Sequence, residues 1–73
     1  MDDIIYTKGI YTATATVRPL DDGKYHGIVS LARDAGDGPE NTVYEVEASS
    51  PSPEEAFEEA KALAHRILGE IDL

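Results

Sequence analysis

Three stretches of the chain alternate between apolar and polar residues, which is the period of a half-buried β-strand. They cover residues 10–18, 25–32 and 42–48. In the third stretch, apolar Tyr44 and Val46 alternate with glutamates, so one face is apolar and the other charged. Glycines and a proline within 33–41 predict an exposed loop before this stretch. The pattern predicts a three-stranded antiparallel meander over 10–48, preceded by an N-terminal segment over 1–9.

The turn between the first two stretches decides which residues face each other. Asp22-Gly23 alone suggests a two-residue hairpin loop, which would place threonines opposite the most apolar residues of the second strand. A three-residue loop, Asp21-Asp22-Gly23 with a left-handed glycine, instead pairs Ala15 with Val29 and Ala13 with Leu31. We favour this second register because it collects apolar side chains on one face.

The last third of the chain has the period of an amphipathic helix, which we expect over residues 52–71. Ser52 can cap its start, Pro53 suits the first helical position, and Glu55 completes a capping box. Small residues on the helix and on the sheet, Gly27 among them, would let the two layers approach closely. The sequence therefore predicts an α+β fold of order β-β-β-α, with one C-terminal helix packed on one face of the sheet.

The chain has 73 residues and no cysteine, which limits how it can be stabilised. A body of this size holds one hydrophobic core, so we expect a single domain over residues 1–73. Burial in so small a core only narrowly exceeds the entropy cost of ordering the chain, and disulfides cannot supply the difference. We therefore expect a homodimer.

The charge balance narrows the class of partner. The chain has 15 Asp and Glu residues and 6 Lys and Arg residues, which gives a formal net charge of -9. This charge repels phosphate backbones and anionic membranes, so we expect no direct nucleic-acid binding, whereas a basic protein partner would be attracted. The N-terminus lacks the positive region of a signal peptide, and no apolar run approaches the roughly 20 residues of a membrane span, so we expect a cytoplasmic protein without membrane contact.

A single helix leaves the outer face of the predicted sheet uncovered. This face is moderately apolar and uncharged, as interaction surfaces often are. We expect a protein partner to bind it through Thr14, Thr16, His26, Ile28, Ser30 and Val43. The strand edges offer a second route, because an added strand would satisfy their free backbone groups. Residues 4–6 could also fold back over one of these surfaces.

The acidic residues at the start of the predicted helix can be explained in two ways. Carboxylates near a helix N-terminus are stabilised by the helix dipole. They would also form an acidic patch for a basic partner, made of Glu54, Glu55, Glu58 and Glu59.

The alternative hypothesis is a small ligand-binding or hydrolase-like domain that uses His26 and Ser30. Both residues lie on the outer face of one strand, where a histidine could activate a serine. They are offset along the strand, lack an orienting acid and lie on an open surface. We therefore expect no catalytic residue. Because no Cys, His or carboxylate cluster has metal-ligand spacing, we also expect no metal and no cofactor.

Two segments carry a family resemblance. The first hairpin reads Asp22-Gly23-Lys24-Tyr25-His26-Gly27-Ile28-Val29, and the helix begins with Ser52-Pro53-Glu54-Glu55-Ala56. They resemble the strand-turn-strand and the helix start of HicB-like antitoxin domains, and the order of elements is similar. The proline- and glycine-rich segment that this family has after its second strand is replaced by Leu31-Ala32-Arg33-Asp34-Ala35-Gly36. The resemblance implies an antitoxin-like module whose partner is a small basic toxin.

Overall fold

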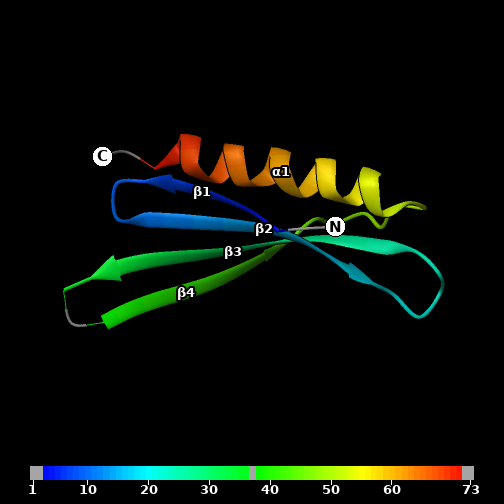
Figure 1. Ribbon diagram of the computed structural model, residues 1–73, viewed down its shortest axis with the longest axis horizontal. Coiled ribbons are helices and arrows are strands. Elements are labelled where there is room, and N and C mark those ends of the chain that lie inside the picture. The colour runs from blue at the N-terminus through cyan, green and yellow to red at the C-terminus, as the bar shows by residue number, and fades with distance from the viewer. Residues whose placement is uncertain (1–2, 37, 72–73) are drawn as a thin grey trace.

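A computed structural model describes residues 3–36 and 38–71. Over these residues, an antiparallel sheet of four strands packs one face against a C-terminal helix, so the fold class is α+β (Figure 1). The elements are β1 (Ile4–Lys8), β2 (Tyr11–Pro19), β3 (Tyr25–Ala35), β4 (Gly38–Glu45) and α1 (Pro53–Glu70). The order in the sheet is β1-β2-β3-β4, so each strand pairs with its neighbours in the sequence.

The prediction of three strands is wrong, because most of the expected N-terminal segment forms the edge strand β1. Residues 1–2 of that segment lie outside the described residues. Lys8 pairs with Tyr11, and Gly9, at φ 60°, begins the two-residue turn between them. β1 is short and has isoleucine on both faces, which conceals its alternation. The glycine turn that follows is the signal that could have revealed it.

The prediction of a loop over residues 33–41 is also wrong for those of its residues that the structure describes. β3 and β4 continue into it and pair as far as Ala35 with Gly38. Across the two strands, the Arg33 guanidinium lies 3.4 Å from the Glu40 carboxylate. Glycine and proline content predicts a loop, but the neighbouring strand supplies hydrogen-bond partners that keep this segment extended.

The proline in β4 is compatible with a strand because it lies at an edge. Pro39 is opposite Asp34, whose amide donates to the Ile10 carbonyl at 2.9 Å. The backbone of residue 39 therefore faces the free side of β4, where no N–H is needed. β4 begins earlier than expected and ends at Glu45, so residues 46–48 lie beyond it.

The register between β2 and β3 is the one that the three-residue loop predicts. Ala15 pairs with Val29 and Ala13 with Leu31. Gly23 has φ 82°, the left-handed conformation that this loop requires. The paired residues are buried beneath the helix, and Ala13, Ala15 and Val29 are fully inaccessible.

Helix α1 begins where the capping pattern predicts. Ser52 has an extended backbone, and its hydroxyl accepts a hydrogen bond from the Glu55 amide at 3.2 Å. The reciprocal bond of a capping box, from the Ser52 amide to the Glu55 carboxylate, is not among the hydrogen bonds of the described residues. The helix continues through Gly69 and has Ile71 as its C-cap, within one residue of the predicted bounds at each end.

Small residues hold the two layers close together. On the helix, Ala56, Ala60 and Ala64 are fully buried against the sheet. A Cβ on Gly27 would lie 2.6 Å from the Ala56 carbonyl oxygen, so glycine is needed for this approach. The helix packs mainly on β2 and β3, with a smaller contact to β1. β4 is therefore left at the margin, and Tyr44 remains 38% exposed.

A residue distant in the sequence holds the helix C-terminus. The Lys8 ammonium donates to the Leu68 carbonyl at 2.8 Å and to the Ile71 carbonyl at 3.2 Å. Within the described helix, the last turn has no basic residue of its own, so Lys8 provides the positive charge that this end of the dipole favours. The Tyr6 ring lies 4.4 Å from the His65 ring, centroid to centroid, and adds a second contact between β1 and α1.

Candidate functional site

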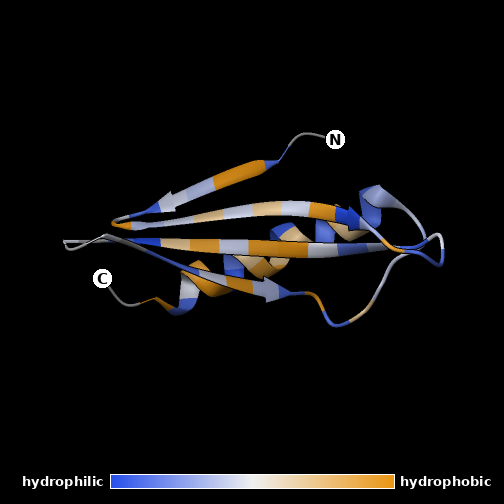
Figure 2. Cartoon of the chain, turned by 90° about the horizontal axis from the view of Figure 1, so that it is seen from below, coloured by the Kyte–Doolittle hydropathy of each residue, from blue (hydrophilic) through white to orange (hydrophobic). Residues whose placement is uncertain are grey.

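The face of the sheet away from α1 brings predicted partner-binding residues together (Figure 2). Residues paired across antiparallel strands share a face. Thr14 pairs with Ser30, and Ser30 pairs with Val43. Ile5 of β1 pairs with Thr14 and extends the series to the fourth strand. These four residues, which we name the central row, contain no charged side chain.

Two further rows flank the central row. One consists of Thr7, Thr12, Ala32 and Asn41. In the other, Thr16 pairs with Ile28, and Ile28 pairs with Glu45, which is the first charged residue on this part of the face. At the usual strand spacing, a row across four strands is about 14 Å long. The helix-free face therefore has an uncharged centre of that width.

Exposure separates the residues that a partner can reach from those it cannot. Val43 is 62% exposed and Ile5 is 63% exposed, and they lie at the two ends of the central row. Ile28 is only 4% exposed, although the sequence suggested it as a contact residue. It lies on the inner strand β3, where Thr16 and Glu45 flank it on both sides. Ile5 was missed because β1 was missed.

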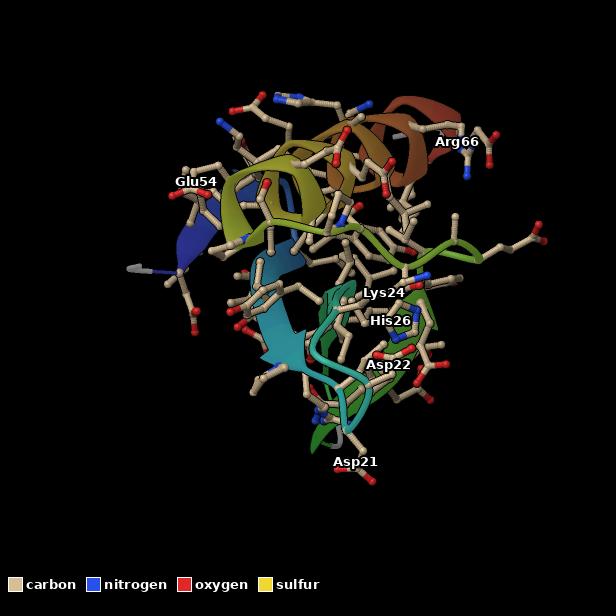
Figure 3. The ribbon with its side chains drawn as sticks, turned by 90° about the vertical axis from the view of Figure 1, so that its right-hand side faces the viewer. Asp21, Asp22, Lys24, His26, Glu54 and Arg66 are labelled. Carbon is tan, nitrogen blue, oxygen red and sulfur yellow. The ribbon has the colours of Figure 1, made fainter. Side chains whose placement is uncertain are left out.

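His26 is half-buried, and its imidazole Nε2 donates a hydrogen bond to the Val46 carbonyl. Figure 3 shows it with the turn residues Asp21 and Asp22, away from the helix. Ser30 is four residues further along β3, which corresponds to roughly 13 Å. Among the described residues, no hydrogen bond joins the two side chains, so they do not form a nucleophile and base pair.

The four glutamates of the predicted acidic patch are not equivalent. Glu54 and Glu55 are exposed, and Figure 3 shows Glu54 on the surface of the helix start. Glu58 forms a salt bridge with Lys61 at 2.7 Å. Glu59 is half-buried and accepts a hydrogen bond from the buried Ser50 hydroxyl at 3.3 Å. The patch is thus divided between free carboxylates and carboxylates with internal partners.

A groove of about 700 Å³ opens between the helix and the chain around the end of β4. It is lined by Tyr44, Glu45, Val46, Glu47, Ala48, Glu59, Ala62, Leu63 and Arg66. Apolar side chains alternate here with three glutamates, and no serine, cysteine or histidine is among these residues. With Arg66 as its single cation, the groove suits an apolar or basic side chain.

No family model matches the chain, and comparisons with curated proteins and with solved structures found no match either. In the part of the chain that the structure describes, no helix is long and apolar enough to cross a membrane. The same residues contain no group of three His, Cys, Asp or Glu side chains that could hold a metal ion.

Proposed function

We propose that this protein is a non-enzymatic interaction module that binds a basic protein partner through the helix-free face of its sheet. The central row supports this proposal, because it is open to a partner and has a large exposed apolar residue at each end, Ile5 and Val43. The centres of protein interfaces are depleted in charge, and an uncovered face of this kind is a frequent site of association.

Charge around the central row favours a basic partner. The chain carries a formal net charge of -9. On the helix-free face, outside the central row, the exposed acids Asp34 and Glu45 outnumber the exposed cation Arg18. A partner with a basic rim would meet opposite charge there, and long-range attraction would raise its association rate at low salt. The resemblance to HicB-like antitoxin domains suggests a small basic toxin as one such partner.

The proposal is tested by a pull-down from a lysate of the source organism with matched lysine substitutions. Val43→Lys and Thr14→Lys place a positive charge in the central row. Ile10→Lys makes the same change of charge at a residue that is 46% exposed in the β1–β2 turn. We expect the wild type and Ile10→Lys to retain the same basic protein, and the two central-row variants to lose at least about tenfold in affinity.

Circular dichroism would confirm that each variant is folded. Retention of the partner by all four proteins would contradict the assignment of the face. Retention of no protein by the wild type would contradict the proposed function itself.

A further inference from the structure

The free edge of β4 presents backbone groups that can be assigned residue by residue. The Val46 amide donates to the Gly27 carbonyl at 3.0 Å, and hydrogen-bonded pairs alternate along an antiparallel ladder. Applied to the register of β3 and β4, this alternation turns the N–H and C=O groups of Asn41, Val43 and Glu45 away from β3. All three residues are exposed.

The edge of β4 is open beyond Pro39, its one proline. Residues 41–45 contain neither proline nor lysine, and α1 packs on the other three strands. β1, at the opposite edge, is shorter, and the same alternation turns only Ile5 and Thr7 outward. β4 is therefore the better acceptor of an added strand.

We infer that the occupant of this edge is a second copy of the chain, joined antiparallel through β4. A twofold axis at Val43 places Val43 opposite Val43 of the second copy, and Asn41 opposite Glu45 of the second copy in both directions. Every outward N–H then meets an outward C=O. No glutamate faces another in this register, so the edge is complementary to itself.

A neighbouring register satisfies the edge less well. Shifting the axis so that Asn41 meets Val43 would place Glu45 opposite Pro39, which has no N–H to donate. The Glu45 carbonyl would then lose its partner. Of these two registers, the axis at Val43 satisfies the backbone groups of β4 better.

The dimer also extends the helix-free face. The central row ends at Val43, and across the axis it continues into the central row of the second copy. Val43, which is 62% exposed in the single chain, would become the middle of a face twice as long. A chain of 73 residues without disulfides also gains apolar burial in this way.

Sedimentation equilibrium of the purified full chain tests the dimer without any partner. Because each copy carries a formal charge of -9, we expect the dimer to tighten when NaCl is raised from about 0.05 M to about 0.5 M. Binding of a basic partner would weaken over the same range. The direction of the salt effect therefore separates this interface from the proposed function.

Charge substitutions test the register. Asn41→Glu places a glutamate opposite Glu45 of the other copy at both ends of the interface, and we expect the dimer to weaken about tenfold. Adding Glu45→Lys turns both contacts into opposite-charge pairs and is expected to restore the wild-type affinity. Within one chain, these positions are roughly 13 Å apart along the strand, so an intramolecular contact cannot explain the rescue. The matched control Thr7→Glu, at the β1 edge, should change the affinity by less than about twofold.

Circular dichroism would establish that each variant is folded. A wild type that stays monomeric up to about 1 mM at both salt concentrations would overturn the inference. It would also be overturned if Asn41→Glu had no effect, or if Glu45→Lys failed to rescue it. A loss caused by Thr7→Glu instead would assign the interface to β1.

Discussion

Replacing Gly27 by alanine is expected to force the helix away from the sheet. The added Cβ would lie 2.6 Å from the Ala56 carbonyl oxygen, 3.1 Å from the Ala60 Cβ and 3.1 Å from the Val46 Cγ2. The nearest of these atoms belongs to the helix backbone, which cannot rotate aside as a flexible side chain would. The substitution can therefore be accommodated only if the strand or the helix moves.

The size of the effect follows from two opposing contributions. Overpacking a core by about one methyl group typically costs about 1–3 kcal/mol. Replacing glycine by alanine also restricts the unfolded chain, which offsets about 0.4–1 kcal/mol of this cost. Because the clash at Gly27 involves backbone, we expect a net loss of about 2 kcal/mol. In a domain of this size, such a loss lowers Tm by roughly 8–16 °C.

Urea unfolding followed by far-UV circular dichroism measures this loss, and Gly69→Ala is the matched control. Gly69 lies in α1, and a Cβ there would have no neighbour within 4 Å. Alanine is the better helix former, so this control is expected to gain about 0.5–1 kcal/mol. The same substitution should thus have opposite signs at the two positions. A Gly27→Ala protein as stable as the wild type would refute the close approach of helix and sheet.

Two further predictions concern Lys8 of β1 and Lys61 of α1. Lys8→Met keeps most of the side-chain length but removes the donor to the Leu68 and Ile71 carbonyls. We expect the free energy of unfolding to fall by about 1 kcal/mol and the amides in the last turn of α1 to exchange faster. Unchanged amide exchange would contradict the capping role of Lys8. The hydrogen bond with Glu58 raises the pKa of Lys61 above 10.5, so its small stabilisation persists at neutral pH and disappears only as the pH rises through the folded-state pKa. Glu58→Gln should lower the Lys61 pKa in an NMR titration, and an unchanged value would exclude this pair as the cause.

The features that were correctly predicted have local causes. The helix start depends on Ser52 and on residues within the next turn, and the β2–β3 register depends on a three-residue loop and the alternation on either side of it. The same alternation places Thr14, Ser30 and Val43 on one face of the sheet, where the structure aligns them in the central row. In each case, the residues that determine the structure are close together in the chain.

The features that were missed depend on contacts between distant residues. β1 is stable as a strand because β2 pairs with it, and the β3–β4 hairpin extends through a glycine-rich stretch because neighbouring strands satisfy its backbone. Ile28 looked accessible from its alternation, but it is only 4% exposed on the inner strand β3, which has a neighbouring strand on each side. Ile5 joined the candidate surface only through the pairing of β1.

By itself, the sequence determined the α+β class, the capped helix, the first hairpin register and the acidic, cysteine-free character of the protein, since each depends on composition or on neighbouring residues. Only the tertiary structure decided that the sheet has four strands, that Lys8 caps the helix C-terminus, and that β4 remains at an uncovered edge. These depend on which segments meet in space, because backbone groups and helix ends accept partners from any part of the chain.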